Sequence, residues 1–191
     1  MMASPVTAVY DANVLYSAPL RDLLLRLAQA GLVRARWPER IHDEWVRNVL
    51  ANNPALSPAR LARTRALMND AVRDCLVIDY EQRIEALSLP DPSDRHVLAA
   101  AIQAKADVIV TFNLKVFPAA ILAAYHLAAV HPDDFVATLF DARPEPVCAV
   151  VKGQRAALIH PPRTAAELLA TLESQGLVQT VARLRPLADR L

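Results

Sequence analysis

The chain opens on a short apolar run at residues 6–10, which predicts a buried strand that ends at Asp11. A helix follows between Pro19 and Gly31, because leucines recur there at helical spacing: Leu20, Leu23, Leu24 and Leu27. Proline near the start of a helix and glycine just past its end are typical of helix boundaries.

Two further helices are predicted before the middle of the chain. Residues 39–51 place apolar side chains on one face, namely Ile41, Trp45 and Val49. Glu44 borders this face because it follows Ile41 by three residues. Ser57 and Pro58 open another helix that runs to about residue 74, and residues 76–80 are too short a segment to decide between strand and loop.

The next segments alternate between helix and strand. Residues 90–94 open a helix that continues through Ile102, and residues 107–111 form a strand that is apolar on both faces. A helix over residues 118–125 then leads into a short strand at residues 127–130. This alternation predicts a three-layer α/β/α fold with a central parallel sheet.

The pattern becomes purely helical towards the C-terminus. Thr164 and Glu167 have the spacing of a capping box, and Gly176 ends the helix that they open. We therefore expect an α/β domain over residues 1–140 and a helical extension over residues 141–191.

The composition adds limits to this picture. Hydrophobic residues make up 54% of the chain, which is enough for a core, and the formal charge of +1 means that any contact with RNA must come from local patches. Cys75 and Cys148 match no metal or redox spacing, so we expect buried free thiols. Without a signal-peptide pattern or an apolar run of membrane-spanning length, we expect a soluble, cytoplasmic protein with no membrane contact.

The small number of glycines excludes several classes of enzyme. A dinucleotide fingerprint or a Walker loop needs several glycines close together, and the chain has three in all: Gly31, Gly153 and Gly176. The five histidines show no HExxH spacing and are expected to be surface or packed residues. No nucleophile elbow supports a Ser-His-Asp arrangement.

Four polar residues are placed to share one cleft. Asp11 ends the first strand, Asn113 follows the strand at residues 107–111, Asp94 opens the helix that leads into it, and Glu44 faces inward. Ligands bind beyond the carboxyl ends of the strands in open α/β sheets, so these groups converge if the strands are neighbours. Crowded carboxylates favour a cation, and oxygen ligands suit Mg²⁺ or Mn²⁺, which in turn suit phosphate chemistry.

Each of these residues also has a purely structural interpretation. Asp11 could cap the turn after its strand, and Glu44 could be an exposed helical acid. Asp91 and Asp94 together resemble a capping box, so Asp94 is equally well explained as a cap. Asn113 could be a turn residue.

Taken together, the ordered set of segments resembles the PIN-domain family. The matching pieces extend over roughly residues 6–135, and they are residues 9–15, 43–45, 91–101 and 106–113. Within that family the chain is most similar to the VapC-type toxins of bacterial toxin–antitoxin pairs, in a subgroup with a helical C-terminal extension.

This resemblance implies a metal-dependent endoribonuclease that acts on RNA through Mg²⁺ or Mn²⁺ and leaves a 5′-phosphate and a 3′-hydroxyl. The implied metal ligands are Asp11, Glu44 and Asp94. Asn113 takes the place of a fourth catalytic acid, Asn13 orients Asp11, and Thr111 positions water. A cognate antitoxin protein and a homodimer are the implied partners.

Two departures from the family pattern leave other functions open. Asn113 removes one carboxylate, and Val116 stands where similar sequences often have aspartate, so a catalytically weak scaffold that binds RNA or protein is one alternative. A haloacid-dehalogenase-like phosphatase is another, with Asp11 as nucleophile and residues 133–134 after a later strand. That mechanism needs a second acid two residues after the nucleophile, and this chain has Asn13 at that position.

Overall fold

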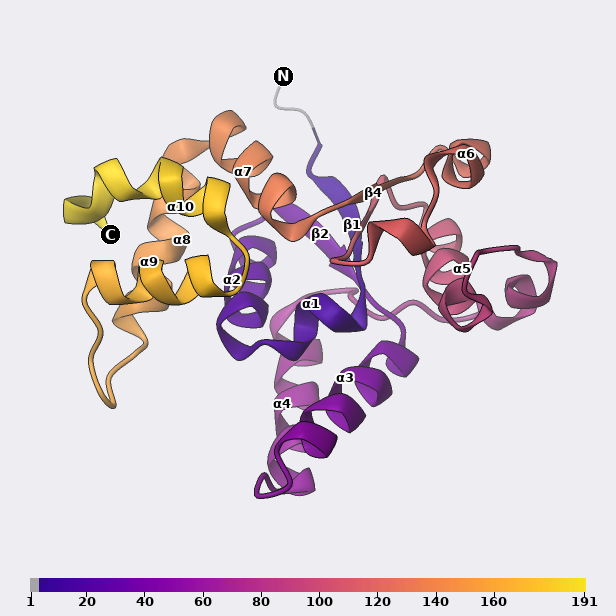
Figure 1. Ribbon diagram of the computed structural model, residues 1–191, viewed down its shortest axis with the longest axis horizontal. Coiled ribbons are helices and arrows are strands. Elements are labelled where there is room, and N and C mark those ends of the chain that lie inside the picture. Colours follow the sequence, from indigo (N-terminus) through magenta and orange to yellow (C-terminus); the bar gives the residue numbers. More distant parts are fainter. Residues whose placement is uncertain (1–3) are drawn as a thin grey trace.

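Four parallel strands form the central sheet, in the order β2-β1-β3-β4. The computed structural model describes residues 4–191, and Figure 1 shows helices on both sides of these strands. The strands are β1 (Val6–Tyr10), β2 (Val33–Arg36), β3 (Val108–Val110) and β4 (Ala128–Val130). Ala8, Val9 and Tyr10 are completely buried, because the central strand β1 is covered on both faces. The predicted three-layer α/β/α fold is confirmed.

The direction of the connections explains which helices cover which face. The step from β1 to β2 passes through α2 (Ala18–Gln29), and the opposite steps to β3 and β4 pass through α5 (Arg95–Gln103) and α6 (Ala119–Leu122). Right-handed crossovers place α2 on one face and the other two on the opposite face, as Figure 1 shows. The strand order reverses between β1 and β3, so a crevice is expected at their carboxyl ends.

Two helices extend from the sheet as a hairpin, α3 (Glu39–Asn52) and α4 (Pro58–Ala71) (Figure 1). The predicted end of the second helix near residue 74 was about three residues too late. The short helix α1 (Ala12–Tyr16) and the strand β2 had not been predicted at all. Residues 76–80 contain no strand, although Leu76 forms a single parallel bridge with Trp37.

The C-terminal part consists of helices that pack onto the same core. They are α7 (Pro132–Ala142), α8 (Pro144–Ala156), α9 (Ala165–Ser174) and α10 (Val178–Leu184). Helix α8 packs on α2, and α10 packs on α7. The predicted capping box of Thr164 and Glu167 is present. Buried residues such as Val151 and Leu172 belong to one hydrophobic cluster with the sheet, so the extension and the α/β part share a core.

A buried carboxylate joins the start of α7 to the start of α10. Asp133 lies in the first turn of α7, and its oxygens accept the backbone N–H groups of Gln179 and Thr180, both at 2.8 Å. The Thr180 hydroxyl donates to the Asp133 carbonyl at 3.2 Å. These bonds satisfy N–H groups of the first turn of α10, which would otherwise be left without partners. Among residues 4–191, no helix is both long and apolar enough to cross a membrane.

Candidate active site

Asp11 lies directly after β1, where its carboxylate is buried. One oxygen accepts the backbone N–H of Ala12 at 2.7 Å and so caps α1. The other oxygen accepts hydrogen bonds from the Thr111 hydroxyl and the Asn13 amide, both at 2.7 Å. Burial raises the pKa of Asp11. The hydrogen bonds from Thr111 and Ala12 oppose this rise, and the negative charge of Glu44 adds to it. Asp11 is therefore both a cap and a buried charge.

Asn13 and Thr111 tie the ends of β1 and β3 together around this carboxylate. The Asn13 amide nitrogen also donates to the Thr111 hydroxyl at 2.9 Å, and its oxygen accepts the Phe112 N–H at 3.1 Å. The Thr111 hydroxyl accepts the Asn113 N–H at 3.0 Å. Because each side chain uses both its donor and its acceptor, the network holds Asp11 in one orientation.

The structure separates the roles of the two acids before α5. Asp91 caps the turn that they share, since its carboxylate accepts the Ser93 N–H at 2.9 Å and the Ser93 hydroxyl at 2.7 Å. Asp94 precedes the first residue of α5, but its side chain makes no capping bond to that helix. The capping interpretation therefore applies to Asp91, and the Asp94 carboxylate is left available for another role.

The ionisation of Asp94 is coupled to that of the neighbouring acids. Burial raises the pKa of Asp94 to about 6, together with the negative charges of Asp11, Asp91 and, to a smaller extent, Glu44. His96 acts in the opposite direction. The charge of Asp11 thus raises the pKa of Asp94, so the ionisation of an acid just beyond β1 affects that of an acid at the start of α5.

Glu44 approaches the site from α3 and is held there by two basic groups. Its Oε1 lies 3.2 Å from His96 Nε2 and 3.3 Å from Arg40 Nε. Burial alone would raise the pKa of Glu44, but His96 and Arg40 outweigh it and lower the pKa. His96 is buried, and its Nδ1 lies 2.7 Å from the Ser93 carbonyl, so Nδ1 carries a proton and Nε2 faces Glu44.

His96 is the site residue that the sequence analysis missed. It was expected to be an ordinary surface or packed histidine because it belongs to no histidine pair. Its position two residues after Asp94 was the available signal. Its contact with Glu44 joins residues that are far apart in the sequence, so it depends on how α3 docks.

The donor set fits a hard divalent cation in its chemistry, although only part of it is assembled. Across residues 4–191, no three histidine, cysteine, aspartate or glutamate side chains are grouped closely enough to hold a metal ion. Asp11 and Asp94 are oxygen donors whose raised pKa values would fall if a cation lay between them. Glu44 could bind such an ion only if its carboxylate gave up its contact with Arg40 or His96.

The two positions that depart from the family pattern lie differently. Asn113 is exposed, and its backbone N–H contacts the Thr111 hydroxyl. Val116 and Phe117 are buried in the hydrophobic core. A carboxylate at position 116 would therefore be placed in the core, where its charge would be buried without a partner.

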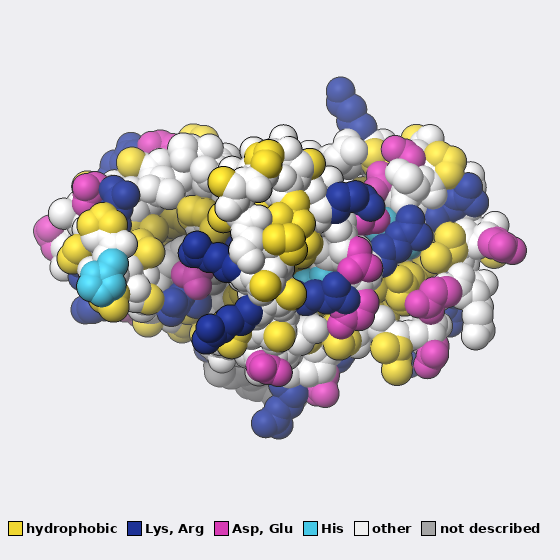
Figure 2. Space-filling model, turned by 90° about the horizontal axis from the view of Figure 1, so that it is seen from below, with side chains coloured by type: hydrophobic (Ala, Val, Ile, Leu, Met, Phe, Trp, Pro, Cys, Tyr) yellow, Lys and Arg dark blue, Asp and Glu magenta, His cyan; other side chains and the backbone are white. Residues whose placement is uncertain are grey.

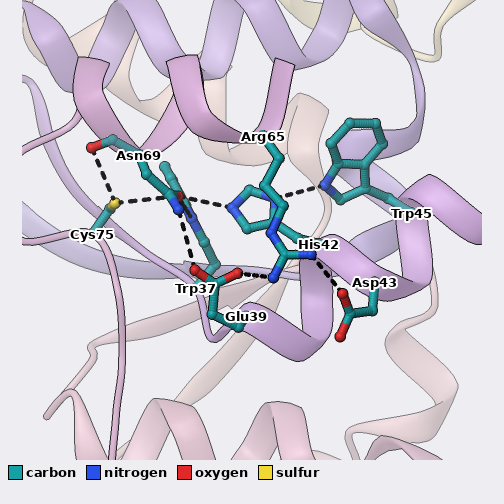
Figure 3. Close-up of polar contacts among 8 residues, drawn as sticks. All are labelled: Trp37, Glu39, His42, Asp43, Trp45, Arg65, Asn69 and Cys75. Atoms are coloured by element: carbon teal, nitrogen blue, oxygen red, sulfur yellow. Dashed lines mark hydrogen bonds and ion pairs between the residues drawn. The ribbon is translucent and has the colours of Figure 1, made fainter. Parts of the chain in front are cut away.

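A buried polar network fixes helix α3, which carries Glu44 (Figure 3). The His42 Nδ1 accepts the Trp45 indole N–H at 2.9 Å, and His42 Nε2 lies 2.8 Å from the Asn69 side-chain oxygen on α4. The Trp37 indole donates to the same oxygen at 3.0 Å. Arg65 adds ion pairs from α4 to Glu39 and Asp43. Both ring nitrogens of the neutral His42 are therefore used.

This arrangement predicts a loss of stability in mild acid. Burial lowers the pKa of His42, so folding favours the neutral ring, and the stability is present above the ordinary pKa and lost as the pH falls below about 6.5. Replacing His42 by leucine should lower the free energy of unfolding by about 1–3 kcal/mol at neutral pH, since the Trp45 N–H loses its partner. The variant should also lose part of the pH dependence, as measured by urea unfolding at about pH 5 and 7.

The matched control is His126→Asn, because His126 is exposed and asparagine tolerates its left-handed backbone, φ 57°. This control should keep the wild-type pH dependence. A His42→Leu variant that is as acid-sensitive as the wild type would show that His42 does not couple protonation to folding.

A second prediction concerns the charge on Asp94. Its folded pKa lies above the ordinary value, so the stability that it contributes in acid is lost as the pH rises through about 6. Asp94→Asn should therefore raise the melting temperature of the metal-free protein at about pH 8, with a difference that shrinks towards about pH 4. Asp91→Ala is the contrasting variant and should lower the melting temperature, because it removes the oxygen that caps the turn. A less stable Asp94→Asn protein at both pH values would restore the capping interpretation of Asp94.

Comparison with known proteins yields two family matches that divide the chain. The PIN domain family matches residues 7–115, more than half of the chain, and the family described as the VapC50 C-terminal domain matches residues 132–186. A curated Mycobacterium tuberculosis protein named "Putative ribonuclease VapC50" is 49% identical over 82 residues. The matched segment is 43% of this chain and spans about half, 48%, of that relative. No solved structure matches.

Proposed function

We propose, on the premise that this chain belongs to the PIN-domain family, that it is a metal-dependent endoribonuclease that hydrolyses RNA phosphodiester bonds. The observation that carries the proposal is the buried Asp11 carboxylate at the end of β1, where the strand order of the parallel sheet reverses, together with the effect of its charge on the pKa of Asp94. Acids with raised pKa values in such a crevice are candidates for function with a physical rationale. The match to the VapC50 C-terminal family and the name of the M. tuberculosis relative support the same conclusion.

In this proposal Asp11 and Asp94 bind Mg²⁺ or Mn²⁺. The ion, when bound, would help to deprotonate the attacking water and neutralise charge on the phosphoryl oxygens. Thr111 and Asn13 keep the Asp11 carboxylate oriented. Glu44 binds a second ion or accepts a proton from water, and Asn113 offers a neutral amide beside the site. The products are a 5′-phosphate and a 3′-hydroxyl.

The phosphatase alternative lacks support in the structure. Both carboxylate oxygens of Asp133 bond to the start of α10, and Asn13 is an amide that donates to Asp11. The alternative of a weakly catalytic scaffold has one observation in its favour: the Glu44 carboxylate already contacts Arg40 and His96 and is not free to bind a metal ion. RNA binding without cleavage would identify such a scaffold.

The test is cleavage of single-stranded RNA by the full chain in Mg²⁺, in Mn²⁺ and in excess chelator. We expect cleavage with either ion, none with chelator, and products that carry a 5′-phosphate. A generic phosphomonoester should not be hydrolysed. Cleavage that persists in chelator, or products that end in a cyclic phosphate, would contradict the proposed chemistry.

We further propose a cellular role as the toxin of a type II toxin–antitoxin pair, acting in the cytoplasm on RNA and restrained by a cognate antitoxin protein. The proposed organisation is a nuclease domain over residues 1–140 and an extension over residues 141–191, in a homodimer. Expression in bacteria should arrest growth, and co-expression of a small protein encoded beside this gene should restore it. The oligomeric state can be measured by light scattering.

A further inference from the structure

The C-terminal extension, together with His131 just before α7, does more than support the fold. We propose that these residues hold Phe112 as a stacking platform for one base of a single-stranded RNA, beside the phosphate that Asp11 and Asp94 would contact. This inference rests on the proposed function and specifies its substrate as unpaired RNA. It also assigns the extension a direct part in substrate recognition.

Phe112 is anchored to the site itself. It follows Thr111 in the sequence, and its backbone N–H donates at 3.1 Å to Asn13, the same side chain whose amide holds Asp11. Its position relative to the carboxylates is therefore set by a hydrogen bond as well as by the chain. The side chain is 37% exposed, whereas Phe117 and Phe135 are buried.

His131 and a turn of the extension both contact the ring. His131, just before α7, contacts it edge to face with ring centres 5.1 Å apart. Gly176, in the turn between α9 and α10, lies so close that a Cβ there would be 3.4 Å from Phe112 Cε1. Gly176 also has a φ of +90°, which favours glycine. The ring is thus partly covered by His131 and Gly176, and the rest of its surface is open to solvent.

The turn that contains Gly176 also borders a cavity, which can receive the next nucleotide of the RNA. Gln175 precedes Gly176 and lines a cavity of about 480 Å³ with Tyr16 and Arg60. Tyr16, a second partly exposed aromatic residue, ends helix α1, which Asp11 caps. A strand that stacks a base on Phe112 and crosses this turn would meet the exposed Arg60, a suitable group for a phosphate.

The charge distribution explains why stacking is needed. The formal charge is only +1, and Figure 2 shows basic side chains interspersed with acidic ones over the visible face. Binding through many phosphate contacts requires an excess of positive charge, and a formal charge of +1 offers little of it. Base–aromatic stacking is available to every base and to unpaired strands in particular, so it supplies affinity that the charges do not.

The experiment measures binding of a fluorescently labelled single-stranded RNA oligonucleotide to the full chain in chelator, by anisotropy. Phe112→Ala and Phe112→Leu should each weaken binding by about 5- to 100-fold, the range expected for loss of one stacked base, and Phe112→Trp should restore it. Leu114→Ala is the matched control, because Leu114 is equally exposed in the same loop, and it should change binding less than about twofold.

The stacked base is located by a series of oligonucleotides that each carry one abasic position. At one position the wild type should lose as much affinity as Phe112→Ala does, and the variant should lose nothing further. Gly176→Ala should reproduce part of the loss, because a side chain is strained at a φ of +90° and the turn that contacts the ring would have to shift. In cleavage assays Phe112→Ala should raise KM and leave kcat within about threefold.

The outcomes separate this inference from the function on which it rests. If the wild type cuts RNA but the Phe112 variants bind it equally well, the stacking inference is wrong and the nuclease stands. The inference would also be overturned if Phe112→Trp lost as much RNA affinity as Phe112→Ala. The same holds if the Phe112 variants bound a protein partner more weakly and RNA as well as the wild type does. A folded wild type that neither binds nor cuts RNA would refute both.

Discussion

Replacing Asp11 by asparagine should lower the rate of metal-dependent RNA cleavage at least ~100-fold, the scale of losing a positioned catalytic group. The negative charge is removed from the carboxylate that Thr111 and Asn13 orient, so the chain loses the donor that its geometry has prepared best. Burial already raises the pKa of Asp11, so a neutral side chain should not unfold the protein. The measurement is kcat/KM on a defined oligonucleotide, with circular dichroism to verify folding.

Glu44→Gln and Asp94→Asn should show losses of similar size if all three acids act in one site. Asp70→Asn is the control because Asp70 is an exposed carboxylate on α4, and it should keep full activity. The Asp11→Asn protein, purified in the same way, also reports any contaminating nuclease. Full activity of Asp11→Asn would remove this carboxylate from the mechanism.

Truncation after residue 141 should abolish the soluble monodisperse protein. The deletion removes α8, α9 and α10 and so uncovers apolar side chains of α2 and α7 that they now cover. Each large apolar side chain that is taken out of the core forfeits about 1.5–3 kcal/mol, so the loss of several exceeds the usual stability of a domain. Light scattering should show aggregation or a changed oligomer, in place of the species formed by the full chain.

A point substitution tests the same packing without removing chain. Leu172→Ala, at a completely buried position on α9, should lower the free energy of unfolding by about 2–5 kcal/mol. Ala170→Ser, on the exposed side of the same helix, should have little effect. A truncated chain that stays soluble, monodisperse and active would show that the extension is dispensable for folding.

Much of the fold follows from local patterns along the chain. The strands β1 and β3 are largely apolar runs because the middle of a parallel sheet is covered on both faces, and such runs are visible without any tertiary information. The edge strand β4 is also an apolar run, although its residues are only partly buried. The strand β2 was missed because its two arginines, Arg34 and Arg36, alternate with Val33 and Ala35. As an edge strand it buries one face more than the other, and four residues are too few to distinguish it from a loop.

The candidate site divides in the same way. That Asp11 and Asn113 stand just beyond strand ends is a property of the sequence, and parallel strands bring such positions to one edge of the sheet. Whether Asp91 or Asp94 caps the turn depends on a few backbone angles, which the sequence leaves open. Val116 likewise reads as a loop residue until the packing of its turn places it in the core.

The sequence by itself determined the layered α/β architecture, the helical C-terminal part and the place of Asp11 just beyond a strand end, because each follows from local periodicity or from position relative to a strand. Only the tertiary structure decided that His96 and Arg40 hold Glu44 and that Gly176 and His131 enclose Phe112. Each of these contacts except Arg40–Glu44 joins residues far apart in the chain. Their geometry depends on how whole helices dock, and docking is set by the sum of many packing contacts that no local pattern contains.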